Sequence, residues 1–412
     1  MATEAAQSAV DGTLPLFPFE RTEMGPAREY RELRETEPFK KVRLWDGNVA
    51  WLVTRYDDVR RLLADNRFSA NPRAPGYPNI TKLRKVLTGT ERPSFIRQDP
   101  PDHTKLRRML TKEFTHQKIQ TMRPLIEEIV DDLIEGMLSG QKPVDFVEAF
   151  ALPLPTQVIM KMLGIPHSDS EFFVERSTTK VRIDVDPEDA IQAGVDMRNF
   201  MRDLIAEKSK APEKYDDILG RMIVDQIQPG HLDIEDAVVS LELLMMAGHE
   251  TTANMTALGV LSLIQNPADM ERLRVNQSDE VVQLAVEEML RYHTILQFVG
   301  TRVATEDVEY NGIAIKAGEG ILPMINAANR DPRVFDQPEI FDIARKSTYP
   351  HVAFGFGVHQ CLGQPLARLE LNVVFNKLPK RIPQIRLAVP FEELEFKRNV
   401  LVHGLISMPV TW

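Results

Sequence analysis

One segment of the chain is long enough to cross the whole molecule as a single helix. Asp233 has a side chain that caps helix N-termini, and Asn266-Pro267 ends the segment about 32 residues later, so the helix would extend about 48 Å. Between Val238 and Ala247 the apolar residues surround the axis instead of forming one stripe, which predicts burial on most faces. The rest of the protein is therefore expected to pack around this helix.

Five consecutive residues interrupt the apolar helix: Gly248, His249, Glu250, Thr251 and Thr252. Glycine weakens a helix by about 1 kcal/mol relative to alanine, and an unpaired buried carboxylate costs more. One interpretation is structural: Glu250 forms a salt bridge with a neighbour, and the threonines bond back to the preceding turn. The other is functional: Gly248 lets a ligand approach the helix, while Thr251 and Glu250 deliver protons to it.

The remaining patterns predict a mainly α protein with small β-sheets. Residues 41–56 have an Asp-Gly turn between two segments rich in Val, Leu and Trp, which is a hairpin pattern. Residues 1–26 are expected to be an irregular lead-in, and the absence of repeats and linkers predicts a single domain over 27–412. The other expected elements are a helix over 57–63, an irregular connection over 69–98, mostly helix over 103–264, strands within 293–325, a helix over 364–378 and a strand within 400–412.

Charge and composition exclude several classes of protein. The formal net charge of -10 argues against coating nucleic acid or an anionic membrane. No run approaches the roughly 18 apolar residues of a membrane-spanning helix, and MATEAAQSAVDG lacks the features of a signal peptide, so a cytoplasmic protein is expected. The single cysteine, Cys361, excludes an internal disulfide and a multi-cysteine zinc site.

Cys361 lies in the segment FGFGVHQCLG, residues 354–363, just before a helix opened by Gln364-Pro365. A thiol at this position faces unpaired amides and the positive end of the helix dipole, which favour the thiolate. The three glycines let the backbone turn tightly and approach a flat partner. A lone cysteine is most often an inert small hydrophobe, but the surrounding glycines, aromatic residues and histidine favour a ligand here.

The segment resembles the haem-binding loop of the cytochrome P-450 family, Phe-Gly-x-Gly-x-His-x-Cys-x-Gly, at every fixed position. Residues 247–252 (AGHETT) are similar to the family's oxygen-activating groove, in which an acid precedes a threonine. Residues 288–291 match its Glu-x-x-Arg signature, and residues 341–345 resemble the segment whose arginine completes that ion cluster. The resemblance extends from about residue 28 to the C-terminus. It implies the single-domain cytochrome P-450 fold, with haem between the long central helix and the helix after the cysteine loop.

The resemblance implies that Glu288, Arg291 and Arg345 form a buried ion cluster beneath the cysteine loop. Loss of one partner there would leave a charge unpaired. The residues taken alone leave a second arrangement open, because either Glu288 or Glu287 has helical spacing to pair with Arg291 on a solvated surface. Such a surface pair would contribute less than about 1 kcal/mol.

The resemblance also implies roles for the candidate site residues. The Cys361 thiolate would be the metal ligand, on the axial position of haem b (iron protoporphyrin IX). Thr251 and Glu250 would be catalytic, because they would supply protons for the activation of O2. The two haem propionates need Arg or His donors, and the matching residues are His103, Arg107, Arg302 and His359.

A monooxygenase that hydroxylates a mostly hydrophobic small organic molecule is the activity that the resemblance implies. Electrons derived from NAD(P)H would arrive through a ferredoxin and a ferredoxin reductase, because the chain has no reductase domain. No nucleic acid or membrane partner is expected. A docking face for the redox partner could be formed by Lys105, Arg108, Lys112 and Arg368.

Two alternatives remain at this stage. LWDGNVAWLVT and EEMLRYHT also resemble the nitric-oxide reductases of the family, which use a nicotinamide cofactor directly, and residues 71–97 hold six basic residues against one acid. The acid-threonine pair favours oxygen activation over that reaction. A non-catalytic haem sensor is the third possibility. By resemblance the substrate pocket is lined by residues 70–97, 244–251, 295–300 and 400–402, whose apolar character predicts a hydrophobic substrate and whose basic part would attract an acidic group.

Overall fold

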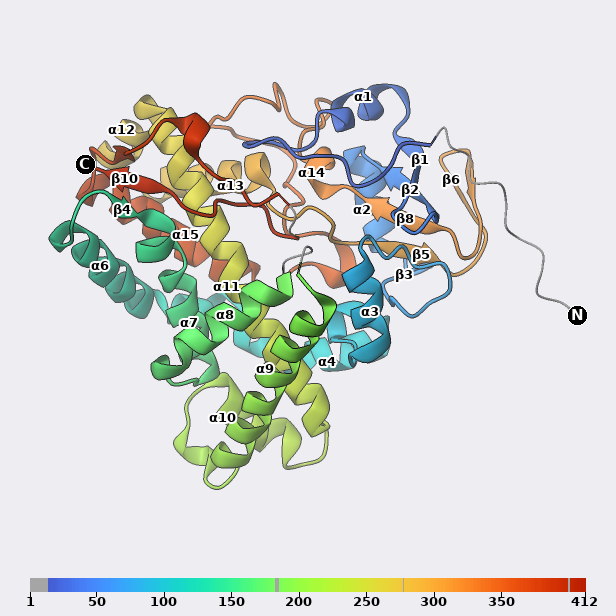
Figure 1. Ribbon diagram of the computed structural model, residues 1–412, viewed down its shortest axis with the longest axis horizontal. Coiled ribbons are helices and arrows are strands. Elements are labelled where there is room, and N and C mark those ends of the chain that lie inside the picture. The colour runs from blue at the N-terminus through green and yellow to red at the C-terminus, as the bar shows by residue number, and fades with distance from the viewer. Residues whose placement is uncertain (1–13, 182–184, 277, 399–400) are drawn as a thin grey trace, which may run out of the picture.

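The computed structural model describes residues 14–181, 185–276, 278–398 and 401–412. Helices form most of it, a five-stranded sheet lies at one end, and a three-stranded sheet lies at the other (Figure 1). The predicted class, mainly α with small β-sheets, is confirmed. Within the described ranges, no helix combines the length and the apolar character needed to cross a lipid bilayer.

The helices extend from Glu29 to Arg381. In order they are α1 (Glu29–Thr36), α2 (Tyr56–Ala64), α3 (Lys82–Thr90), α4 (Asp102–Thr111), α5 (His116–Gln120), α6 (Arg123–Ser139), α7 (Pro153–Leu163), α8 (Ser170–Val181), α9 (Pro187–Lys208), α10 (Ile218–Met222), α11 (Ile234–Gln265), α12 (Pro267–Val275), α13 (Asp279–His293), α14 (Ile325–Ala328) and α15 (Gln364–Arg381). The strands β5 (Arg302–Ala304) to β8 (Gly320–Pro323) lie between α13 and α14, and a long loop lies between α14 and α15.

Helix α11 is the predicted central helix, and it runs through the middle of the molecule (Figure 1). The Asp233 side chain accepts a hydrogen bond from the Glu235 amide at 2.8 Å, as expected of a cap. Every residue from Thr252 to Leu263 is buried. Helices α7, α9 and α15 pack against α11, so the prediction of a helix buried on most faces is confirmed.

The strands form three sheets. The largest has the order β1-β2-β8-β5-β3, in which β2 and β8 are parallel and the other pairs are antiparallel. The predicted hairpin in residues 41–56 is confirmed as β1 and β2, and the strands expected within 293–325 are β5 to β8. The strands are β1 (Phe39–Arg43), β2 (Val49–Val53), β3 (Phe68–Ser69), β4 (Val144–Asp145), β5 (Arg302–Ala304), β6 (Val308–Tyr310), β7 (Ile313–Ile315), β8 (Gly320–Pro323), β9 (Arg386–Leu387) and β10 (Pro409–Thr411).

The structure corrects two expectations about local structure. The connection 69–98 is not wholly irregular, because it contains α3, whose N-terminus is capped by the Thr81 hydroxyl. The strand expected within 400–412 is confined to β10. Before β10 the pairing is limited to isolated antiparallel bridges, of Val402 with Leu296 and of Leu405 with Phe396. Between these bridges Gly404 packs on α11, where a Cβ would approach the Asn254 side chain to 1.8 Å.

Candidate active site

The cysteine loop, residues 354–363, is closed by its own backbone and by its packing on α2. The Cys361 amide donates a hydrogen bond to the Phe354 carbonyl oxygen at 2.8 Å. Gly357 has a φ of 74°, which glycine adopts without strain. A Cβ at this position would lie 2.4 Å from the carbonyl oxygen of Leu63. Glycine is therefore required for the close packing of the cysteine loop on α2.

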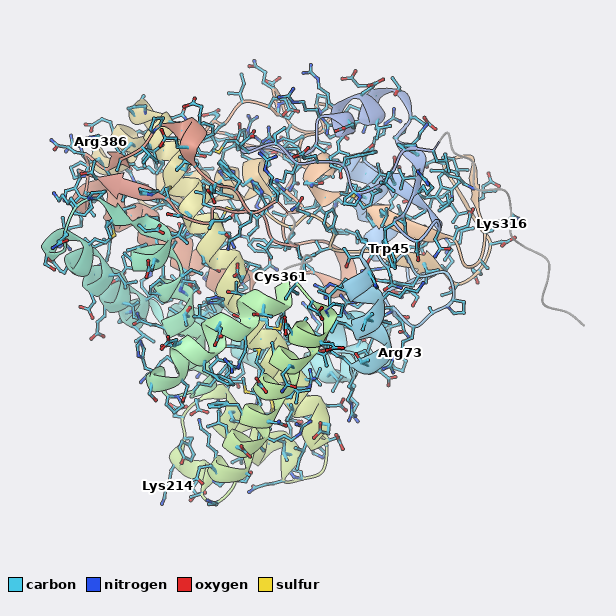
Figure 2. The ribbon with its side chains drawn as sticks, viewed as in Figure 1. Trp45, Arg73, Lys214, Lys316, Cys361 and Arg386 are labelled. Atoms are coloured by element: carbon cyan, nitrogen blue, oxygen red, sulfur yellow. The ribbon has the colours of Figure 1, made fainter. Side chains whose placement is uncertain are left out.

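Cys361 lies near the middle of the molecule, yet its sulfur is accessible because it faces a cavity (Figure 2). Burial raises the pKa of the Cys361 thiol, and it outweighs the lowering by the Gly363 and Gln364 amides and by Arg107. The expectation of a favoured thiolate from the helix N-terminus is wrong in its net direction, because enclosure costs the charged form more than the amides return. A metal cation at the sulfur would reverse this balance, since a coordinating thiol loses its proton.

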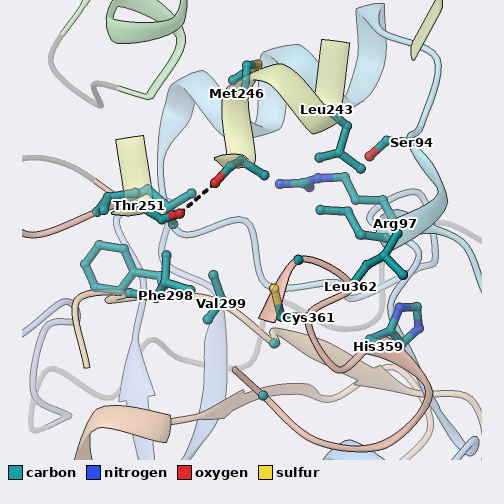
Figure 3. A pocket seen from close by; sticks show the side chains of 18 of the residues that line it. Ser94, Arg97, Leu243, Met246, Thr251, Phe298, Val299, His359, Cys361 and Leu362 are labelled. Atoms are coloured by element: carbon teal, nitrogen blue, oxygen red, sulfur yellow. Dashed lines mark hydrogen bonds between the residues drawn. The ribbon is translucent and has the colours of Figure 1, made fainter. Parts of the chain in front are cut away.

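A cavity of about 510 Å³ separates the cysteine loop from α11. Cys361 and Leu362 lie on one side of it, and Thr251 and Met246 lie on the other (Figure 3). Each of the four segments predicted to line a pocket contributes residues to the walls of this cavity. Val400, which belongs to one of these segments, lies outside the described residues. This is the position in which the resemblance places the haem.

The polar interruption of α11 shows the bonds that the structural interpretation expects, and it also faces the cavity. Thr251 Oγ1 donates to the Ala247 carbonyl oxygen at 2.6 Å. Glu250 is 2% exposed and pairs with Lys397 Nζ at 3.1 Å, and Asn254 Nδ2 donates to its Oε2 at 2.8 Å. Burial opposes ionisation of Glu250, but Lys397, His249 and the hydrogen bond from Asn254 together outweigh it and hold the carboxyl pKa below its usual value. Glu250 is therefore a fixed carboxylate, and both it and Thr251 line the cavity.

Four predicted basic residues meet at one edge of the cavity. The His103 and His359 rings lie with their centroids 4.2 Å apart. Arg107 Nη2 donates to the Gln360 carbonyl oxygen at 2.6 Å, and the Arg302 guanidinium donates only to its neighbour's carbonyl oxygen among the described residues. Burial, followed by the charges of Arg302, His103 and Arg107, lowers the pKa of His359 to about 3. The charge of Asp99 acts on His103 and Arg302, but no carboxylate of the described residues forms an ion pair with the cluster.

This basic cluster fits a group that carries two carboxylates. Both ring nitrogens of His103 and Nδ1 of His359 are buried and have no hydrogen-bond partner among the described residues. Buried polar atoms are normally satisfied, so the unpaired nitrogens indicate that an acceptor is missing from the protein itself. Together with a thiol that faces a cavity with mostly apolar walls, they form a donor set suited to haem.

The predicted ion cluster of Glu288, Arg291 and Arg345 is present and buried. Arg291 donates to both carboxylate oxygens of Glu288 at 2.7 Å, and Arg345 Nε donates to Oε2 at 3.0 Å. The side chains of Glu288 and Arg291 are only 1% and 2% exposed. Glu287, the alternative partner of Arg291, pairs instead with Arg368 at 2.6 Å. The alternative prediction, in which Arg291 pairs with Glu287 or Glu288 on a solvated surface, is therefore wrong.

The four residues proposed as a docking face do not all lie together. Lys105, Arg108 and Lys112 line one surface groove, and Lys112 also pairs with Asp225. Arg368 is on α15, where it is occupied by Glu287 and stacks on Phe354 at 4.6 Å. Arg368 therefore supports the cysteine loop, and the candidate docking face reduces to the first three residues.

The sequence did not reveal a buried acid on α15. Glu370 lines the cavity, and its Oε2 is buried without a hydrogen-bond partner among the described residues. Burial raises the pKa of Glu370 well above its usual value, which favours the protonated form. The detectable signal was its position between Leu369 and Leu371 in an apolar stretch of the helix.

We expect Glu370→Gln to stabilise the protein increasingly as the pH rises. Above about pH 4.3 the unfolded chain loses this proton and the native state keeps it, so wild-type stability falls by up to about 1.4 kcal/mol per pH unit until the native pKa is reached. Glutamine removes this dependence. Urea unfolding at pH 5 and pH 8 measures it, with the exposed Glu309→Gln as the control. An identical gain at both pH values would contradict the prediction.

Comparison with known proteins agrees with this geometry. The family described as "Cytochrome P450" matches residues 13–181 and 187–380. Cytochrome P450 GfsF of Streptomyces halstedii is 43% identical over 413 residues, covering 99% of this chain and 98% of that protein. Vitamin D3 dihydroxylase of Streptomyces griseolus is 40% identical over 412 residues, 100% of each chain.

A solved structure extends the agreement to the fold. Mycinamicin VIII C21 methyl hydroxylase MycCI from Micromonospora griseorubida, bound to mycinamicin VIII, superimposes with a TM-score of 0.91 at 36% identity. The match covers 97% of this chain and 100% of that one, which confirms the predicted fold. The chain therefore belongs to the cytochrome P450 family of haem-thiolate monooxygenases.

Proposed function

We propose that this enzyme hydroxylates a C–H bond of a mostly hydrophobic small organic molecule, with haem b bound through Cys361. The main support is that the only sulfur of a cysteine in the chain opens into a cavity opposite Thr251 of α11. Haem ligated by a thiolate activates O2 and, with two electrons and two protons, inserts one oxygen atom into a C–H bond. The protein's own side chains would bind the propionates and deliver the protons.

The basic cluster would hold the two propionates. Its supporting observation is the set of unpaired nitrogens on His103 and His359 beside two arginines with few partners. Charge-assisted hydrogen bonds to carboxylates are about twice as strong as neutral ones. The residues that bind the propionates in this proposal are His103, Arg107, Arg302 and His359.

Thr251 and Glu250 would control proton delivery. Because the Thr251 hydroxyl donates its proton to Ala247 O, its lone pairs remain free to accept a hydrogen bond from a protonated oxygen group in the cavity. Glu250 is held as a carboxylate by Lys397, whose side chain is 17% exposed. This ion pair links the cavity to a partly exposed donor and provides a route for protons.

The electrons would come from NAD(P)H through a ferredoxin reductase and a ferredoxin. Lys105, Arg108 and Lys112 share a surface groove that suits an acidic partner. We also propose a cytoplasmic enzyme, and the net charge of -10 argues against a nucleic acid or anionic membrane partner. Arg368 has no part in this docking face, because it is paired with Glu287.

The experiment supplies the purified holoenzyme with ferredoxin, reductase, NADPH, isotopically labelled O2 and a panel of hydrophobic compounds. We expect products that contain one labelled oxygen atom. In Thr251→Ala, product formed per NADPH consumed should fall by about an order of magnitude or more, because proton delivery is lost while electron uptake continues. Thr251→Ser keeps the hydroxyl and should retain most of the coupling.

Two outcomes would overturn the proposal. Rapid oxidation of NADH with nitric oxide, in the absence of any redox partner, would identify a nitric-oxide reductase. A protein that shows neither a substrate-induced spin shift nor turnover with any electron donor would be a haem sensor.

A further inference from the structure

Three acids line the wall of the cavity on the side of α11, and each of them forms an ion pair with a basic residue. Glu91 and Glu242 both pair with Lys180, at 2.8 and 2.6 Å, and with Arg198, at 3.1 and 3.2 Å. Glu250 pairs with Lys397, as described above. No acid of this wall is therefore left over, among the described residues, to balance further positive charge.

Arg84 and Arg97 are the basic residues that this pairing leaves unbalanced. Both line the cavity, and neither guanidinium has a hydrogen bond or ion pair with any described residue. Arg84 is on α3, the helix that the sequence did not predict, and Arg97 extends into the cavity toward α11 (Figure 3). Burial, and then the charge of Arg97, lowers the pKa of Arg84 to about 10, although Glu91 and Tyr77 act in the opposite direction. Glu91 already forms ion pairs with Lys180 and Arg198, so Arg84 and Arg97 are two cations without an ion-pair partner that act on each other.

These two arginines are separate from the cluster assigned to the propionates. The charges that act on His359 are those of Arg302, His103 and Arg107, whereas the one cationic charge that acts on Arg84 is that of Arg97. The two propionates of the proposed haem would balance the first cluster. The pair formed by Arg84 and Arg97 would then need a further anion.

The surfaces around the pair are apolar, which limits what this anion can be. Leu87, Phe95 and Leu243 line the cavity beside the two arginines. A free inorganic ion would leave these surfaces in contact with water, whereas an organic acid would cover them with its apolar part. A carboxylate offers the two oxygens that a guanidinium binds with paired hydrogen bonds.

We propose that Arg84 and Arg97 form a subsite for a carboxylate carried by the substrate, so that the enzyme acts on amphipathic organic acids. The carboxylate would anchor one end of the substrate at α3 and the segment before α4, and the apolar part would extend toward Cys361. This inference rests on the proposed function for the reaction itself, but the binding preference is measured independently of turnover.

The test is isothermal titration calorimetry of the holoenzyme with decanoate and with methyl decanoate. We expect the wild type to bind the acid at least about 10-fold more tightly than the ester. Arg84→Gln and Arg97→Gln should each reduce this preference to about 3-fold, and the double variant should abolish it without changing the affinity for the ester. Lys82→Gln is the matched control, because Lys82 is on the same helix, is exposed and does not line the cavity.

Three results would overturn the inference: equal binding of acid and ester by the wild type, an acid preference that survives in the double variant, or an equal loss in Lys82→Gln. Haem content is measured for each variant, and a fall in Arg97→Gln would assign that residue to the propionates and overturn it as well. If the acid preference holds but no product forms with any donor, the proposed function fails and the subsite stands. If product forms from esters and acids alike and the wild type binds both equally, the proposed function stands and the carboxylate subsite fails.

Discussion

Cys361→Ser should yield a folded protein without the Soret band of the reduced carbon-monoxide complex that marks thiolate ligation, and its monooxygenase activity should fall to background. Serine has nearly the size of cysteine, and the side chain faces a cavity, so the substitution leaves the packing unchanged. The chain has no other cysteine, so no second thiolate is available to bind the iron. Absorbance spectroscopy and the coupled turnover assay measure the two effects.

The controls separate loss of the ligand from loss of the fold. Far-ultraviolet circular dichroism of Cys361→Ser should match the wild type. A thiol reagent should modify the wild-type protein at one site when haem is absent, because the sulfur is accessible from the cavity, and it should not react when haem is bound. A variant whose reduced carbon-monoxide spectrum is identical to that of the wild type would show that Cys361 is not the iron ligand.

Glu288→Gln should destabilise the protein by about 3–5 kcal/mol, because it removes the acid of the buried ion cluster and leaves the guanidinium groups of Arg291 and Arg345 without a carboxylate partner. Glutamine keeps the size of the side chain and one acceptor oxygen, so the loss reports the charge and not a cavity. Glu288 Oε1 also accepts the Asp342 amide at 2.9 Å, which ties the cluster to the following loop. Urea unfolding at pH 7 measures the change.

Glu287→Gln is the matched control, since it is the neighbouring residue on α13 and its carboxylate is 41% exposed. Burial opposes ionisation of Glu287, but His351 and Arg368 outweigh it and lower its pKa to about 2. Its stabilising effect is therefore present above the unfolded pKa of about 4.3 and is lost as the pH falls toward 2. At pH 7 we expect a loss of less than about 1 kcal/mol, since exposed pairs are weak. Equal losses in both variants would contradict the buried cluster.

Local sequence patterns were sufficient to predict those elements whose conformation depends on residues close by in the chain. The cap at Asp233 and the proline at 267 bounded α11, and alternating apolar residues around the Asp46-Gly47 turn identified the hairpin. The glycine spacing around Cys361 identified the loop. Helix α3 was missed because the prolines and glycines on either side of it outweighed the nine residues of helical sequence between them.

Pairings between distant residues could not be read from the sequence. Nothing near Glu250 indicated that Lys397, 147 residues later, would neutralise it. Nothing near Arg84 and Arg97 indicated that neither would form an ion pair within the described part of the chain.

Helix α11, the hairpin and the cysteine loop follow from local sequence, because backbone propensity, capping and turn chemistry act over a few residues. The pairing of the buried charges, the nitrogens left without partners among the described residues and the exposure of the Cys361 thiol to the cavity arise only in the folded protein. Those properties depend on electrostatic and packing contacts between segments that the chain brings together only when it folds.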